Sequence, residues 1–539
     1  MSLADHLLGN KRRVDARRIV TLLWLSGIAF LAAYLSLVLL SRLGLPVEMV
    51  IAIIGVGMAL ITLVGGLYGR TMNSRTFFFT HKSAGIAPSG ISACTDWLSG
   101  GFLLLILVAT GTDRLILAPS VMIGMLLCTI LFATAFQRSK VSTVPGFMTM
   151  RYDKRSVGLV ALIFVAIVLG LLLVTEVKLA SHLVTKLMVV EPFTALLMVI
   201  ILIVLPTLIG GWMALVIMNA ILVVWILICV LLPATVTGFF SNFLISIISY
   251  QSPTNLTDVL EFSELAGFNG FNLQSETIFQ TAITTLVLSC GFACLPHALS
   301  RLTLSFHHVT VLESIGWSAL SGFLVLSAFP LSIGLLAVEA STGQLSQALS
   351  QQPILQMLPA LAILLAALNA ASVTVFALSS AIIRLLRRTR NLDPGERTMF
   401  ATRALSVILC GGLVFMFQMF SPQIGLTFLA AICISASALF APLTAAIWAS
   451  RISPWAVAAA MFVGGGMTSV FIAAPFVSTL FPQASYYAGQ IPVLAPTSAS
   501  GLGMLAGIVI LIIGRGFALL SKSHTDEKLD DLRLLNREA

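Results

Sequence analysis

Ionisable side chains interrupt three of the long apolar stretches of this sequence, and they are the residues best suited to chemistry. Asp96 lies in AGIAPSGISACTDWLSGGFLLLILVATG (84–111), Glu176 and Lys178 lie in VLGLLLVTEVKLASHLV, and His297 lies in ETIFQTAITTLVLSCGFACLPHALSR. A charge at membrane depth costs about 2.5–3.5 kcal/mol on insertion scales, so each of these groups is expected to face protein or water. The chemistry they offer is the binding of ions, protons or polar solutes.

Asp96 sits in a stretch that is too long and too interrupted for one straight helix. Its 28 residues would span about 42 Å, against about 30 Å of hydrocarbon, and they include Pro88 and four glycines before residue 102. The sequence therefore predicts a broken helix, with Asp96 beside the hydroxyls of Thr95 and Ser99. The functional interpretation is an ion or solute site. The alternative is that Asp96 caps a half-helix or pairs with a lysine for assembly.

Glu176 and Lys178 are two residues apart, so on a helix they point about 200° from each other and do not pair. Each requires a partner elsewhere, and Asp96 is the obvious one for Lys178. The functional interpretation is a titratable Glu176, or a lysine standing where a cation would otherwise bind. The alternative is a position at the lip of a cavity.

Two further stretches carry polar groups at membrane depth. In 276–298, Gly291 and then Pro296 predict a second broken helix, because proline removes a backbone donor and kinks a helix. His297 beside this break is interpreted as structural or gate-lining, with direct contact to solute or proton as the alternative. In 355–386, Asn369 and several hydroxyls could supply oxygen ligands to Na⁺, although such residues also serve helix packing.

Composition places the chain among polytopic membrane proteins. Of its 539 residues 58% are hydrophobic and 9% are charged, and the mean hydropathy is +1.04. The seven cysteines lie in apolar stretches, which indicates neither a disulfide framework nor a metal site. No nucleotide-binding loop or hydrolase motif appears, so an enzyme is the least favoured class. Hydropathy marks fourteen candidate spans, near 20–42, 48–68, 84–111, 115–137, 157–188, 192–210, 212–236, 276–298, 313–338, 355–386, 397–420, 425–449, 453–476 and 497–520.

The net charge of +9 is explained by topology rather than by a nucleic-acid partner. Nearly all lysines and arginines fall on alternate connecting segments, and the loops 237–275, 339–354 and 477–496 contain none. The positive-inside rule then places both termini in the cytoplasm. The expected organisation is a cytoplasmic N-terminal segment (1–19), a transmembrane domain (20–520, with its core in 84–449) and a cytoplasmic tail (521–539).

Several stretches, taken in order, resemble the solute:sodium symporter family, and within it the acetate-permease-like monocarboxylate group. They are CTDWLSGGFLLL (94–105), STVPGFMTMRYDKRSVG (142–158), IGGWMALVIMNAILVVWILI (209–228), CGFACLPHALSRL (290–302) and VTVFALSSAI (373–382). The resemblance implies an all-α LeuT-type fold, in which five helices are repeated in inverted order, with extra flanking helices. The spans at 84–111 and 276–298 would then be its two broken helices.

The resemblance also implies a sodium site. Carried over to this sequence, its backbone carbonyls come from Cys94, Trp97 and Ala366, and its two hydroxyl positions fall on Asn369 and Ala370. The side-chain amide of Asn369 can ligate Na⁺, whereas Ala370 has no side-chain oxygen. Three other positions also depart from the family pattern, namely Glu176, Lys178 and Gly146. These departures keep proton coupling, or no coupling, open as the alternative.

The sequence thus predicts a multi-pass inner-membrane secondary transporter that moves a small organic solute, such as the monocarboxylate acetate, by alternating access. The coupling ion is Na⁺ or H⁺, and no other cofactor is expected. Asp96, Cys94, Trp97, Ala366 and Asn369 are the ion-coupling candidates. The substrate or gating candidates are Ser99, Glu176, Lys178, Gly291, Pro296 and His297. A sensor that keeps the fold without transporting is the rival class.

Overall fold

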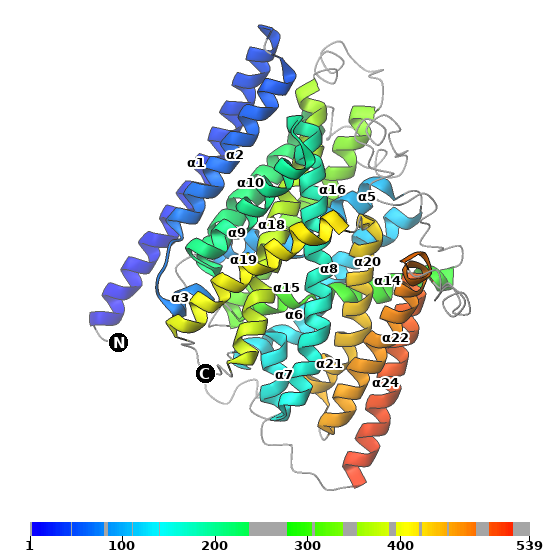
Figure 1. Ribbon diagram of the computed structural model, residues 1–539. Helices are drawn as coiled ribbons and strands as arrows, with labels where there is room; N and C mark the ends of the chain where they lie inside the picture. Colours follow the sequence, from blue (N-terminus) through cyan, green and yellow to red (C-terminus); the bar gives the residue numbers. More distant parts are fainter. Residues whose placement is uncertain are drawn as a thin grey trace.

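A computed structural model gives the architecture of the chain (Figure 1). It describes residues 3–44, 46–79, 85–109, 112–139, 141–236, 278–303, 308–337, 353–387, 395–419, 423–449, 452–480 and 495–520. Within these residues the regular structure is helical throughout, as the apolar runs predict. The predicted tail, 521–539, lies outside the described residues. The first helix begins at Leu3 and runs through the first predicted span, and the division at residues 19 and 20 stays a prediction.

The first half of the chain supplies the first broken helix and the helices around it. They are α1 (Leu3–Arg42), α2 (Val47–Tyr68), α3 (Ser74–Phe79), α4 (Ile86–Ala93), the short turn η1 (Cys94–Asp96), α5 (Gly100–Val108), α6 (Thr112–Ser139), α7 (Val144–Tyr152), α8 (Arg155–Met188), α9 (Pro192–Ile209) and α10 (Trp212–Val236). Gly211 makes the tight turn between α9 and α10 at φ +58°, where an added Cβ would lie 2.6 Å from the Phe77 carbonyl oxygen.

The second half begins with the second broken helix. Its helices are α14 (Ile278–Ala293), α15 (Pro296–Leu302), α16 (His308–Ala337), α18 (Pro353–Leu386), α19 (Glu396–Met419), α20 (Ile424–Ser435), α21 (Ala441–Trp448), α22 (Pro454–Leu480) and α24 (Pro496–Leu520). Between α20 and α21 the chain makes a π-helical turn, η2 (Ala436–Phe440).

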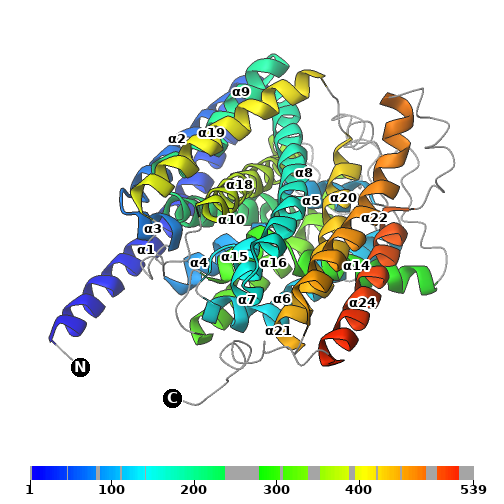
Figure 2. The same cartoon turned by 60° about the horizontal axis from the view of Figure 1, so that its bottom comes forward.

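Helix α18 forms the centre of the bundle. Its most apolar window, within Met357–Leu386, is 100% buried, and α8 and α10 pack against it. Helices α1 and α2 lie on one flank, and α22 and α24 pair on the opposite flank (Figures 1 and 2). The most enclosed helices are therefore those that surround the broken segments.

The helices have the length and apolarity of a multi-pass membrane protein. In the described residues, 10 helices are long and apolar enough to cross a membrane, or up to 12 if each of two bent helix pairs is one span. These pairs are Ile86–Asp96 with Gly100–Val108, bent by 52°, and Ile278–Ala293 with Pro296–Leu302, bent by 50°. Both predicted breaks are therefore confirmed. The described residues of the fourteen predicted ranges fall mainly on these helices, and the number of spans stays a prediction. The inverted repeat stays a prediction.

One detail of the second break was predicted wrongly. Gly291 does not interrupt the helix but lies inside α14, and the break falls between Ala293 and Pro296. A Cβ at Gly291 would lie 2.4 Å from the Ile432 carbonyl oxygen, so this glycine allows α14 to approach α20 closely. Pro296 opens α15 at its first turn, where a missing backbone donor costs no helical hydrogen bond.

Candidate functional site

The site lies where the two broken helices meet, and local chemistry explains the first break. After η1 the backbone leaves the helix, and the Cys94 carbonyl oxygen accepts hydrogen bonds from the amides of Trp97 (3.3 Å) and Leu98 (3.1 Å). Ser99 then takes an extended conformation, and its hydroxyl accepts from the Phe102 amide at 3.3 Å. This is an N-cap, so the helix restarts at Gly100 with a new N-terminus inside the protein.

A buried ion pair joins the two broken helices. The Arg301 guanidinium of α15 donates from Nη2 to Asp96 Oδ1 at 2.9 Å, its Nε lies 2.5 Å from Asp96 Oδ2, and its Nη1 donates to the Ser92 hydroxyl at 2.7 Å. The Trp212 ring lies 5.2 Å from the guanidinium carbon. Asp96 is thereby neutralised by a two-point contact, the arrangement that makes a buried carboxylate tolerable.

The Asp96–Arg301 pair corrects the predicted partner of Lys178. Asp96 binds Arg301, and Lys178 is half-buried on α8 and does not line the central cavity. Arg301 was not among the predicted site residues. Its spacing of four residues from His297 was the available signal, because that spacing puts both side chains on one face of a helix.

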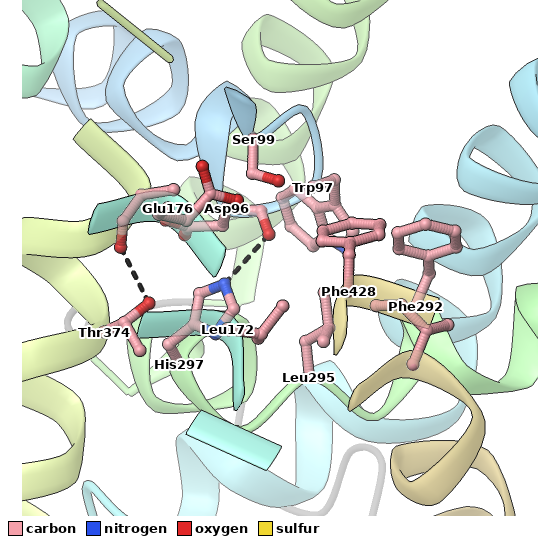
Figure 3. A pocket seen from close by; sticks show the side chains of 12 residues that line it. Asp96, Trp97, Ser99, Leu172, Glu176, Phe292, Leu295, His297, Thr374 and Phe428 are labelled. Carbon is pink, nitrogen blue, oxygen red and sulfur yellow. Dashed lines mark hydrogen bonds between the residues drawn. The ribbon is translucent and has the colours of Figure 1, made fainter. Parts of the chain in front are cut away.

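His297 makes a second link between the broken helices. Its Nε2 lies 2.9 Å from the Asp96 carbonyl oxygen, which can only accept, so Nε2 carries the hydrogen (Figure 3). His297 is 3% exposed, and its Nδ1 has no hydrogen-bond partner among the described residues. The imidazole therefore fixes the break on one side and leaves one ring nitrogen available on the other.

Glu176 of α8 occupies the N-terminus of α5. The Gly101 amide lies 3.2 Å from each of the two carboxylate oxygens, and the side chain is 1% exposed. A helix N-terminus favours negative charge, through its free N–H groups and its dipole. An added Cβ at Gly101 would lie 2.8 Å from the Phe428 ring and 3.1 Å from Glu176 Oε1, so the contact requires glycine. A Cβ at Gly100 would lie 2.5 Å from that of Ala367 on α18.

Asp96, Glu176 and His297 line one small cavity at the centre of the bundle (Figure 3). Glu176, Thr374 and His297 lie toward one end of the view, and the rings of Trp97, Phe428 and Phe292 lie toward the other. The empty volume is about 260 Å³, but tight packing leaves room for about one water molecule. The full lining is Asp96, Trp97, Ser99, Leu172, Glu176, Phe292, Leu295, His297, Ala370, Thr374, Phe428 and Ile432.

The structure brings five predicted residues together at this cavity: Asp96, Trp97, Ser99, Glu176 and His297. The remaining candidates, Cys94, Lys178, Gly291, Pro296, Ala366 and Asn369, do not line it. The aromatic and apolar lining at Phe292, Leu295, Phe428 and Ile432 was missed, because apolar residues on an apolar helix carry no distinguishing signal in the sequence.

The predicted sodium ligands on α18 are buried close to the cavity. Asn369 is 0% exposed, and its Nδ2 donates to the Asn219 carbonyl oxygen of α10 at 3.4 Å. Its Oδ1 has no partner among the described residues. Ala370 lines the cavity but has no side-chain oxygen. The nearby Thr374 hydroxyl donates to the Ala370 backbone carbonyl at 2.7 Å. Among the described residues, no three His, Cys, Asp or Glu side chains gather as metal ligands.

The fold has solved relatives. No protein-family model matches the chain, and no curated protein matches it in sequence. The structure is similar to a substrate-bound, outward-open Na⁺-coupled sialic acid symporter, with a TM-score of 0.58, 15% identity, and coverage of 88% of this chain and 98% of that one. It also matches a manganese transporter of Eremococcus coleocola, with a TM-score of 0.49, 13% identity, and coverage of 80% and 94%. The first similarity shows that the chain has the fold of that symporter.

Proposed function

We propose that the chain is a secondary active transporter that carries a small organic solute across the inner membrane by alternating access. The observation that carries this proposal is the cavity between two broken helices. A break frees backbone N–H and C=O groups at membrane depth, and transporters use such groups to bind solutes and ions. The fold shared with a Na⁺-coupled symporter supports the same function. Catalysis is not proposed, because the chain shares its fold with a transporter.

The solute we propose is a short monocarboxylate such as acetate, and the family we propose is that of the solute:sodium symporters. The motifs CTDWLSGGFLLL and CGFACLPHALSRL support the family. The N-terminus of α5 supports the solute, since its N–H groups and dipole suit a carboxylate. Phe292, Leu295 and Ile432 form an apolar side of the cavity, which suits the short hydrocarbon part of such a solute. Its small size favours a solute of few atoms, bound after a modest opening.

The coupling ion is Na⁺ or H⁺. For Na⁺ the proposed ligands are the carbonyls of Cys94, Trp97 and Ala366 and the amide of Asn369. The unpartnered Asn369 Oδ1 supports this site, and the missing oxygen at Ala370 weakens it. For H⁺, the carboxyl of Glu176 is the titratable group at the cavity.

Alternating access requires two gates, and the Asp96–Arg301 pair is suited to one of them. With both termini in the cytoplasm, α4 and α15 are the cytoplasmic halves of the broken helices. The pair and its Ser92 contact tie these halves together beside the cavity. Separation of the two halves would open the cavity to the cytoplasm, and re-forming the pair would close it.

Counterflow in proteoliposomes tests this function directly. Purified protein is reconstituted with unlabelled carboxylate inside, and labelled acetate or pyruvate is added outside, with and without a Na⁺ gradient. A transient overshoot of label, absent from protein-free liposomes, is expected because exchange needs no net driving force. Saturable binding without counterflow would favour the non-transporting sensor. The absence of both binding and counterflow across a panel of small carboxylates would overturn the proposed solute class.

A further inference from the structure

The α5 N-terminus is already occupied by an anionic group of the protein itself. The Glu176 carboxylate receives the Gly101 amide between its two oxygens, both at 3.2 Å. A solute carboxylate that accepts from the Gly101 N–H must displace Glu176, because this N–H is already shared by both Glu176 oxygens. The two carboxylates therefore compete for one helix terminus.

The charges around Glu176 make this competition sensitive to protons. Asp96 also lines the cavity, but Arg301 neutralises it. His297 donates to a backbone carbonyl, and Lys178 projects from α8 about 200° away from Glu176. The cavity-facing residues of α18, α20 and α14 (Ala370, Thr374, Phe428, Ile432 and Phe292) are not titratable. An anionic solute would thus meet the uncompensated charge of Glu176 in a closed, apolar space, and this repulsion opposes binding.

We propose that the solute carboxylate replaces Glu176 at the α5 N-terminus only when Glu176 has taken up a proton, so that one proton travels with each monocarboxylate. This inference rests on the proposed monocarboxylate transport and adds its coupling ion. In the step, a proton from bulk water adds to a Glu176 carboxylate oxygen, and the Gly101 N–H, which stays intact, donates its hydrogen bond to the solute instead of to Glu176. Release of the solute on the other side returns the proton to water. One cation and one anion cross together, so the cycle moves no net charge.

Two unpartnered ring nitrogens complete the subsite. Trp97 is 4% exposed, it lines the cavity, and its Nε1–H has no acceptor among the described residues. We infer that this unused N–H donates to the incoming carboxylate. The His297 Nδ1, which is free of hydrogen because Nε2 carries it, is an acceptor in the same cavity. It can accept the O–H of the protonated Glu176. The cavity lining therefore contains one unused donor and one unused acceptor for the exchange.

The test measures proton movement and solute movement separately. Labelled pyruvate is the probe, because its neutral form is scarce and leaks slowly through lipid. Wild-type proteoliposomes with an acidic exterior should accumulate pyruvate toward about tenfold for a gradient of about one pH unit, since one solute moves per proton. In detergent, addition of pyruvate to weakly buffered protein should take up about one proton per bound anion.

The decisive variant is Glu176→Gln, whose amide oxygen can still accept from Gly101. We expect no proton uptake on binding, no accumulation driven by the pH gradient, and counterflow that no longer responds to pH. Glu176→Asp keeps a carboxyl group and should retain proton uptake. Glu313→Gln removes an exposed carboxylate of α16 and should behave as wild type. Should Glu176→Gln fail to fold, proton uptake by wild type and Glu176→Asp still decides the matter.

The outcomes separate this inference from the proposed function. Proton coupling through Glu176 would be overturned by wild-type counterflow without proton uptake, or by proton-driven accumulation in Glu176→Gln. The proposed monocarboxylate transport would remain supported in both cases. Proton release on binding would overturn the proton coupling as well. A wild-type protein that neither binds nor exchanges any monocarboxylate would overturn both.

Discussion

Arg301 binds both carboxylate oxygens of Asp96 across the interface between the two broken helices. The two residues are 205 positions apart in the sequence, and both are buried. The Ser92 hydroxyl and the Trp212 ring surround the guanidinium, so the pair is hydrogen-bonded as well as charge-balanced. Together with the His297 hydrogen bond to the Asp96 carbonyl, this contact joins α15 to η1 at one wall of the cavity.

Removal of one member of this pair should be costly. Asp96→Asn leaves the Arg301 guanidinium buried without a counter-charge, and Arg301→Gln does the same to Asp96. Each variant should lose about 3–5 kcal/mol of folding free energy and most of the counterflow. The double variant should lose less than the sum, because it buries no unpaired charge. Thermal unfolding in detergent and counterflow measure the two effects.

The control for these variants is Glu313→Gln, which changes an exposed carboxylate. If Asp96→Asn transports as well as wild type, the pair has no role in the transport cycle. If the single losses add up in the double variant, the two residues are not energetically coupled.

Gly101 should tolerate no side chain. In Gly101→Ala the new methyl would lie 2.8 Å from the Phe428 ring and 3.0 Å from the Thr175 methyl, which forces α5 away from α8. We expect a loss of about 1–3 kcal/mol and impaired uptake. Gly170→Ala, also in a helix, meets no heavy atom within 4 Å and should be neutral or stabilising by about 0.5–1 kcal/mol. Equal behaviour of the two variants would show that the close packing at Gly101 is unimportant.

The breaks could be predicted from the sequence, whereas their partners could not. Glycines and Pro296 act on the local backbone, so their positions are enough to predict an interrupted helix. The partner of Asp96 depends on which face of α15 turns toward η1, and that is decided by tertiary packing. Lys178 was chosen because it stands in an apolar run, where a charge is conspicuous. Arg301 was overlooked because it stands near a span end, where arginine is common.

The role of Glu176 shows the same limit. The free-energy cost of a carboxylate at membrane depth could be predicted from the sequence, and this cost was the reason to predict a titratable role. The actual partner of Glu176 is a backbone amide of α5, and backbone groups carry no mark in the sequence. The cavity residues Phe292 and Phe428 could not be predicted either, since their neighbours along the chain are equally apolar.

His297 should act through its donor nitrogen. His297→Leu removes the hydrogen bond to the Asp96 carbonyl and leaves that buried oxygen without this partner, at a cost of about 1–3 kcal/mol. His297→Gln places an amide donor near the position of Nε2 and should recover part of the stability. Transport should follow the same order, with wild type above glutamine and glutamine above leucine. A leucine variant as stable as wild type would contradict the importance of this link.

Asn369 is the residue through which Na⁺ coupling can be examined. Its Nδ2 is held by the Asn219 carbonyl oxygen, so its unpartnered Oδ1 is kept in a fixed direction. If this oxygen ligates Na⁺, Asn369→Ala should weaken the stimulation of uptake by Na⁺ by about tenfold or more, the worth of one good contact to a charge. Asn219→Ala is the matched control, because the carbonyl that receives Nδ2 belongs to the backbone and remains. Na⁺ titrations of uptake should therefore shift for Asn369→Ala and stay in place for Asn219→Ala. A shift of equal size in both variants would show that the effect is not specific to the Asn369 oxygen. Wild-type uptake that does not depend on Na⁺ would exclude Na⁺ coupling and favour proton coupling through Glu176.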